Sequence, residues 1–137
     1  HARQVSTRAP QWTHGGVALG PKPRSYRLSM NKKMKRVALF SAFSSKVNAN
    51  ELVVVDSITA ESYSTKAMAA MVNAVSGAKK TLIVLPAVDE KVVKSCANIP
   101  GVKTTVYNAI NVYDILNCDK LVLAKGAAEK IQEVYVK

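Results

Sequence analysis

The segment Leu82-Ile83-Val84-Leu85-Pro86 says more about the fold of this chain than any other. Four consecutive apolar residues stopped by a proline are typical of a strand that is covered on both faces. Similar runs occur at Leu52 to Val55, more weakly at Val102 to Val106, and as a short run at Leu121 to Leu123. The sequence therefore predicts four short strands in a buried sheet.

Helical patterns follow each of these runs. Apolar residues recur there at helical spacing: Met68, Met71, Val72 and Val75; Val92, Val93 and Cys96; Val112, Ile115 and Leu116; and Ala127, Ala128, Ile131, Val134 and Tyr135. Gly77 is a predicted helix stop, and Asp89 and Asn111 are predicted N-caps. Strands that alternate with helices imply a parallel sheet. We therefore expect a small three-layer α/β domain with a mostly parallel sheet flanked by helices.

A further helix is predicted from about Asn31 to Val47, capped by Asn31 or Ser29. Its apolar stripe is Leu39, Phe40, Phe43 and Val47, with Met34, Val37 and Ala38 beside it. Its first turns hold Lys32, Lys33, Lys35 and Arg36. Cations at a helix N-terminus oppose the macrodipole, at roughly 0.3–1 kcal/mol each in exposed settings. An anion from outside the chain would turn this penalty into a gain.

Positive charge is concentrated at the start of the chain. The formal net charge is +11, yet residues 1–36 contain nine cations, including all five arginines, and no acid. From Glu51 onward, ten lysines face nine carboxylates, so Lys79, Lys80 and the later lysines are expected to form a solvated face. An unbalanced block rich in guanidinium groups points to phosphate oxygens as its partner.

Residues 1–29 are predicted to form an extended basic N-terminal arm, and residues 30–137 the helix and the globular domain. Six residues break regular structure in the arm: Pro10, Gly15, Gly16, Gly20, Pro21 and Pro23. The arm has few apolar residues, so we expect it to become ordered only on a partner. Trp12 and Tyr26 lie between its cations, where base stacking or an interface is favoured over core burial. His14 fits a phosphate or base contact and a solvated loop position equally well.

The same residues argue against an enzyme. Residues 51–137 contain no His and no Arg, so their serines have no imidazole base, and no nucleophile elbow or phosphate loop occurs. Asp89 and Glu90 fit capping and first-turn positions better than an acid/base pair. Cys96 and Cys118 match no metal or disulfide motif and are expected to be buried free thiols. No apolar run approaches the roughly 20 residues that span a bilayer. We therefore expect no catalytic residue, metal, cofactor or membrane partner.

The stretch from Gly15 to Tyr26, Gly-Gly-Val-Ala-Leu-Gly-Pro-Lys-Pro-Arg-Ser-Tyr, closely resembles the signature of large-subunit ribosomal protein four, bacterial type. The likeness also covers residues 6–12, 31–39, 88–90, 98–102, 111–116 and 119–123. It implies an α/β domain on the outer side of the large subunit and a long basic loop that reaches the wall of the polypeptide exit tunnel. It also implies binding to several domains of 23S-type rRNA and a role in early large-subunit assembly.

The resemblance further implies neighbouring large-subunit ribosomal proteins as partners, no small-molecule substrate, and a cytoplasmic location in the ribosome, or in a plastid ribosome. Two departures from the family are visible. The family's N-terminal strand and helix and the outgoing arm of its loop are not in this sequence, and Thr13-His14 stands where a basic residue and a glycine are common.

The residues expected to bind rRNA are Arg3, Gln4, Ser6, Thr7, Arg8, Trp12, His14, Lys22, Arg24, Tyr26, Arg27, Lys32, Lys33, Lys35 and Arg36. Two other classes of protein stay open at this point. One is an α/β enzyme that processes RNA or nucleotides, and the other is a protein whose basic tail binds anionic lipid.

Overall fold

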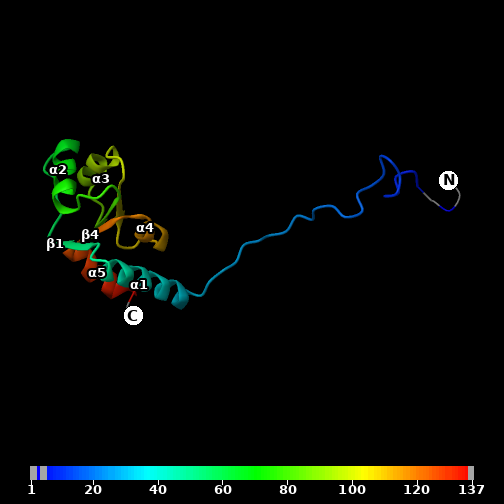
Figure 1. Ribbon diagram of the computed structural model, residues 1–137. Coiled ribbons are helices and arrows are strands. Elements are labelled where there is room, and N and C mark those ends of the chain that lie inside the picture. The colour runs from blue at the N-terminus through cyan, green and yellow to red at the C-terminus, as the bar shows by residue number, and fades with distance from the viewer. Residues whose placement is uncertain (1–2, 4–5, 136–137) are drawn as a thin grey trace.

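The computed structural model describes residue 3 and residues 6–135, and its globular part is a parallel sheet with helices on both faces (Figure 1). The strands are β1 (Leu52–Val55), β2 (Thr81–Leu85), β3 (Val102–Val106) and β4 (Lys120–Ala124), in the order β1-β4-β2-β3. The helices are α1 (Lys32–Asn48), α2 (Thr65–Val75), α3 (Glu90–Ala97), α4 (Val112–Asn117) and α5 (Lys125–Tyr135). The predicted fold class is confirmed, and every strand pair that the structure describes is parallel.

The two central strands, β4 and β2, form the middle of the core. All five residues of β2 are buried, as are four of the five in β4. Leu82 pairs in register with Leu121 of β4, and Ile83 with Val122. This burial explains why the two runs are continuously apolar, since neither face of a central parallel strand meets water.

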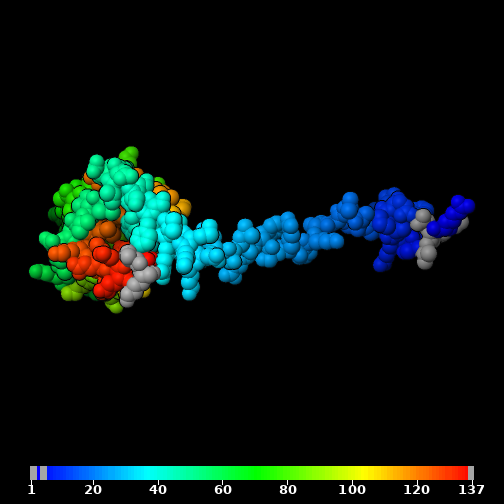
Figure 2. Space-filling view, turned by 90° about the horizontal axis from the view of Figure 1, so that it is seen from below, coloured from blue at the N-terminus to red at the C-terminus, as the bar shows by residue number. Residues whose placement is uncertain are grey.

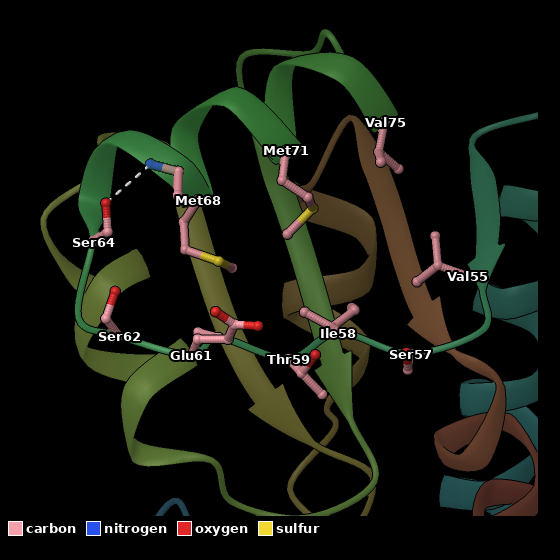
Figure 3. Close-up of a pocket in the computed structure, with 12 residues that line it drawn as sticks. Val55, Ser57, Ile58, Thr59, Glu61, Ser62, Ser64, Met68, Met71 and Val75 are labelled. Carbon is pink, nitrogen blue, oxygen red and sulfur yellow. Dashed lines mark hydrogen bonds between the residues drawn. The ribbon is translucent and has the colours of Figure 1, made fainter.

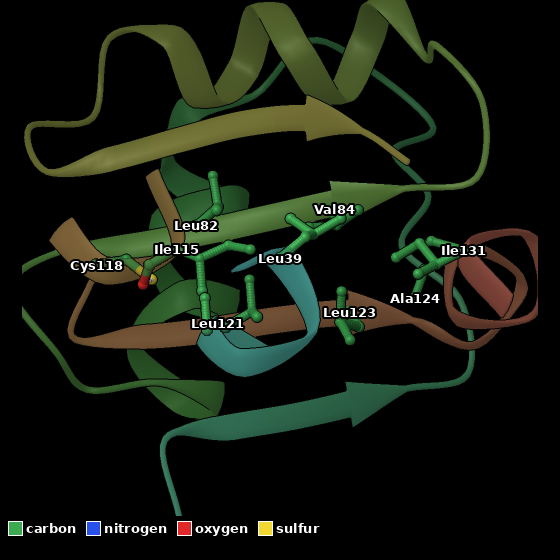
Figure 4. Packing of buried hydrophobic residues seen from close by; sticks show 11 residues of the cluster. Leu39, Leu82, Val84, Ile115, Cys118, Leu121, Leu123, Ala124 and Ile131 are labelled. Atoms are coloured by element: carbon green, nitrogen blue, oxygen red, sulfur yellow. Dashed lines mark hydrogen bonds between the residues drawn. The ribbon is translucent and has the colours of Figure 1, made fainter. Parts of the chain in front are cut away.

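Successive side chains of β2 pack against two different helix layers, because they point to opposite faces of the sheet. Leu82 and Val84 join a cluster with Leu39 of α1, Ile115 of α4 and Ile131 of α5 (Figure 4). Ile83 and Leu85 join a second cluster with residues of α2 and α3. In Figure 1, α2 and α3 accordingly lie on the side of the sheet opposite α1 and α5.

Most predicted helix boundaries are confirmed. Asp89 accepts a hydrogen bond from Lys91 N–H, and Asn111 accepts one from Asp114 N–H at 2.7 Å. Gly77, just past α2, has a positive φ of 58°, which glycine adopts without steric cost. Asn31 is the N-cap of α1, but its side chain makes no capping hydrogen bond.

The predicted apolar stripe of α1 is wrong at its C-terminal end. Val47 is 55% exposed, whereas Lys46 is buried with Leu39 and Ala42. The Lys46 ammonium donates to the Cys118 main-chain carbonyl at 2.5 Å and to Glu51 Oε2 at 2.6 Å. A buried lysine is tolerated where its charge is paired and hydrogen-bonded. Because Cys118 is the C-cap of α4, the cation also lies at the negative end of that helix.

Candidate nucleic-acid interface

The arm lies outside the packed domain. Residues 6–31 contain no helix or strand, and they extend away from the globular part (Figure 2). Every residue from 16 to 31 is exposed, and even Leu19 and Leu28 are 98% and 94% exposed. The arm therefore presents its cations, its backbone and its few apolar side chains to whatever it binds.

Near its start, the arm folds into a compact turn. Trp12 N–H donates to Ala9 O at 3.0 Å, and Gly15 N–H donates to Trp12 O at 2.9 Å. Gly16 N–H closes the turn on Arg8 O at 2.7 Å. A Cβ at Gly15 would lie only 2.0 Å from Ala9 O, so the turn requires glycine there. The sequence predicts that Gly15 and Gly16 break regular structure, but it does not reveal that the turn's own backbone requires glycine at position 15.

Further along the arm, an arginine stacks on a tyrosine. The guanidinium carbon of Arg24 lies 4.3 Å from the centroid of the Tyr26 ring, within cation–π distance. Tyr26 is 74% exposed, and the next cation, Arg27, has its N–H bonded to Ser25 Oγ at 3.3 Å. This segment therefore places a flat aromatic surface beside two positive charges, a combination that suits an unpaired base and its phosphate.

The first turns of α1 continue the positive strip. Lys32, Lys33 and Lys35 are exposed, Arg36 is half-buried, and no acidic residue lies in the first turn. Helix N-termini carry unpaired N–H groups and a positive dipole end, which favour an anion. The first turn of α1 has no acidic side chain that could pair with these N–H groups or with the positive end of the dipole.

A groove of about 580 Å³ lies beside these turns. Its lining combines three cationic residues with mostly apolar residues of α1 and of distant segments: Met30, Lys32, Lys35, Arg36, Ala38, Leu39, Ile110, Asn111, Val112 and Tyr135. The sequence reading missed the lining residues 110–112 and 135. They are brought to α1 only by the folding of the domain, and the helix patterns that contain Asn111, Val112 and Tyr135 give no sign of a groove.

The predicted binding residues form a strip rather than one pocket. Arg3 is exposed, and Ser6, Thr7, Arg8, Trp12 and His14 lie on the turn. Lys22, Arg24, Tyr26 and Arg27 follow along the extended segment, and Lys32, Lys33, Lys35 and Arg36 lie on α1. Gln4 lies outside the described residues.

At the usual ligand position of a parallel α/β sheet, α5 follows its strand directly. Such ligands bind outside the carboxyl ends of the strands where the strand order reverses, here between β4 and β2. However, α5 begins directly after β4, and a Cβ at Gly126 would lie 3.5 Å from Pro86. Lys130 Nζ also donates to Pro86 O at 2.8 Å. Gly126 thus packs against Pro86 at ordinary van der Waals distance, and Lys130 bridges α5 to the end of β2.

Other chemistry-bearing residues are scattered. Within residue 3 and residues 6–135, no group of three or more His, Cys, Asp or Glu side chains comes together as a metal site would need. Cys96 and Cys118 are buried free thiols, as predicted, and burial raises the pKa of both. None of the helices described has both the length and the apolar character required to cross a membrane.

These features define a class of protein: a small α/β domain that presents a long cationic arm. Residues 1–134 match the model of the Ribosomal protein L4/L1 family, and the chain belongs to that family. It is 54% identical over 134 residues to the large ribosomal subunit protein uL4 of Clostridium novyi (strain NT). The identity to the proteins of the same name is also 54% for Clostridium botulinum (strain Loch Maree / Type A3) and 47% for Ruminiclostridium cellulolyticum.

The family named from the sequence is thus confirmed. Each of these matches covers 98% of this chain and 65% of the relative's own length. The chain therefore spans slightly less than two thirds of the relatives that it matches.

Proposed function

We propose that this chain is a structural component of the large ribosomal subunit and binds its rRNA through the arm and the first turns of α1. One observation carries the proposal: nine cations and no acid occur in the first 36 residues. The cations of the described part of the arm lie on an exposed segment that does not pack against the domain. The relatives' name, large ribosomal subunit protein, supports the same role.

In this proposal, the division of labour along the strip follows from the chemistry of each side chain. Arginines and lysines neutralise phosphates and provide most of the affinity. These contacts depend little on the base sequence of the RNA. Trp12 and Tyr26 stack on unpaired bases, as aromatic side chains do in single-stranded RNA loops. The domain holds the end of the strip in place, because Lys46 ties α1 to α4 and to the residue before β1.

The wider role is inferred from the family. We propose contacts with several domains of 23S-type rRNA and with neighbouring large-subunit proteins, support of early subunit assembly, and an arm that approaches the polypeptide exit tunnel. The site of action is then the ribosome, in the cytoplasm or in a plastid. The division of the chain into a binding arm at 1–29 and a domain at 30–137 belongs to the same proposal.

An enzyme of nucleotide or RNA processing is the weaker alternative. The basic strip offers no carboxylate that would serve as a base, and residues 51–137 contain no histidine. We therefore propose that the chain is not an enzyme. Purified protein should hydrolyse neither nucleotides nor RNA above background, and a turnover abolished by one substitution within residues 51–137 would contradict this.

Equilibrium binding tests the proposed function. Fragments of large-subunit rRNA and vesicles of phosphatidylserine and phosphatidylcholine are titrated in parallel at several salt concentrations. If about six of the nine cations meet phosphates, the slope of log affinity against log salt is roughly −4 to −5 for the RNA. Equal or tighter binding to the vesicles would favour the lipid alternative.

Trp12→Ala separates stacking from charge. We expect it to weaken RNA binding by roughly 1–3 kcal/mol and to leave the salt slope nearly unchanged. Tyr63→Ala is a matched control, because Tyr63 is a 60% exposed aromatic residue on the domain. The proposed role of Trp12 fails if the two variants bind RNA equally well.

A further inference from the structure

A second hollow lies on the domain, between α2 and the loop that follows β1 (Figure 3). Its volume is about 520 Å³, within the roughly 300–1,000 Å³ typical of ligand pockets. In Figure 3, Met68, Met71 and Val75 point from α2 toward the loop that carries Ile58. Polar side chains of the loop line the cleft as well: Ser57, Thr59, Glu61, Ser62 and Ser64.

The cleft is built into the fold, because both ends of its loop are fixed. The loop leaves β1 at one end. At the other end, Ser64 N–H donates to the buried Ser95 Oγ at 3.1 Å, and Ser64 Oγ caps α2 by accepting from Ala67 N–H. Lys91 of α3 donates to the Glu61 carbonyl oxygen at 2.9 Å. The loop therefore stands beside α2 in a defined position without needing a ligand to place it.

The apolar residues of the cleft are incompletely covered. Met68 is 5% exposed, but Met71, Val75, Ile58 and Val55 are only half-buried. All of them belong to or pack against the cluster beneath α2 and α3, so the cleft opens directly onto the edge of the core. An apolar side chain that entered would remove this surface from water, which favours binding.

The loop that lines the cleft carries acidic side chains, unlike the arm. Residues 47–65 contain Glu51, Asp56 and Glu61 and no cation, and Glu51 is already paired with Lys46, which leaves Asp56 and Glu61 on the loop. Glu61 is the charged residue among those that line the cleft, and no hydrogen bond or ion pair of its carboxylate is found in the described part of the chain. The Lys91 ammonium is bonded to the main-chain oxygen of Glu61, which leaves the Glu61 carboxylate to attract a cationic side chain of a ligand.

We propose that this cleft binds an extended basic segment of a protein partner. An aliphatic side chain of the partner enters between Met71, Val75 and Ile58, and a neighbouring lysine or arginine pairs with Glu61. The hydroxyls of Ser57, Thr59 and Ser62 offer hydrogen bonds to the partner's main chain. This goes beyond the proposed function, because the cleft shares no residue with the arm and needs no RNA.

Titration of the isotope-labelled chain by NMR tests the proposal. The probe is a capped heptapeptide of alternating lysine and leucine, and two further peptides replace its leucines by serine or its lysines by glutamate. We expect the first peptide to shift the amide resonances of residues 57–62 and the methyl resonances of Met71. The two altered peptides should bind at least about fivefold more weakly, because each lacks one of the two interactions.

Two charge-reversal variants provide the decisive comparison. Glu61→Lys should weaken binding of the lysine–leucine peptide by about threefold to tenfold, the range for replacing an exposed ion pair by a like-charge pair. Glu129→Lys makes the same charge change on an exposed residue of α5 and should alter affinity by less than about 1.5-fold.

Several results would overturn the proposal. One is equal weakening by the two variants, which would mean general charge attraction. Another is the absence of cleft shifts at millimolar peptide. A third is a cleft that responds to a uridine decamer as strongly as to the peptide, since RNA would then be the ligand. A fourth is a shift that depends on protein concentration alone, which would identify a second copy of the chain as the occupant.

Discussion

Replacing Lys46 by methionine tests how strongly one buried cation holds α1 to the domain. The substitution keeps the apolar stem and removes the ammonium, whose side chain is 9% exposed. The buried Cys118 carbonyl then loses its donor, a cost of about 1–3 kcal/mol. Glu51 also loses its partner, but it is 39% exposed and can be rehydrated, so the larger penalty of a fully buried unpaired charge does not apply.

We therefore expect Lys46→Met to lower the free energy of unfolding by about 2–3 kcal/mol. For a domain of this size, that corresponds to a fall in Tm of roughly 10 °C. Urea unfolding followed by circular dichroism at 222 nm measures it. Glu51→Gln, which retains a polar partner, should cost about 1 kcal/mol or less.

Lys94→Met is the matched control. Lys94 and Glu90 also form an ion pair, at 3.3 Å, but their side chains are 64% and 72% exposed. Such a pair contributes less than about 0.5 kcal/mol. If Lys46→Met were no more destabilising than Lys94→Met, the bond from Lys46 to Cys118 would not fasten α1, and the reasoning from burial would be refuted.

Three further predictions follow from the turn, the thiols and the arm. Gly15→Ala should weaken rRNA binding about threefold to tenfold by disrupting a preorganised turn, with Tm unchanged. Gly20→Ala should do little, because only the movable side chain of an exposed valine lies near Gly20, and equal affinities of the two variants would refute the role of the turn. Burial raises the pKa of the Cys96 and Cys118 thiols, so the unfolded chain releases their protons at lower pH than the folded chain does. The free energy of unfolding should therefore fall as the pH rises above 9.0, the ordinary pKa of the thiol, and a double Cys→Ala variant with the same pH dependence would contradict this. In the free protein, hydrogen exchange should be fast at residues 6–29 and slow in β2, and strong protection of the arm would count against its ordering on RNA.

The sheet could be predicted because its signals are local. Each strand is a short apolar run, and in Leu82 to Leu85 every residue is buried because the strand is central. Caps such as Asp89 and Asn111 bond within two or three residues of themselves, so their role is visible in the sequence alone. Features of this kind depend little on the rest of the fold.

The features that were missed depend on distant parts of the chain. The burial of Lys46 could not be predicted, because its partner Cys118 lies 72 residues away. Ser64 caps α2 and is itself held by Ser95, which is 31 residues further on. No pattern of spacing predicts a polar side chain that is buried by its tertiary partners.

The candidate binding strip could be predicted in composition but not in shape. The absence of acids before Glu51 identified the cationic residues. The contact of Arg24 with Tyr26 and the requirement for glycine at position 15 needed three-dimensional positions. The cleft beside α2 left no sequence signal, since the apolar spacing of Met68, Met71 and Val75 indicates only a helix face.

The salt dependence of rRNA affinity in two doubly substituted variants tests whether the arm, rather than the domain, binds the phosphates. Each variant loses two exposed cations: Arg24→Ala with Arg27→Ala on the arm, and Lys79→Ala with Lys80→Ala on the domain. We predict that the arm variant binds more weakly and that its slope of log affinity against log salt is flatter by about 1.4–1.8. The domain variant should match the unsubstituted chain. A lysine pair as costly as the arginine pair, with an equal loss of slope, would place the binding surface on the domain and contradict the proposal.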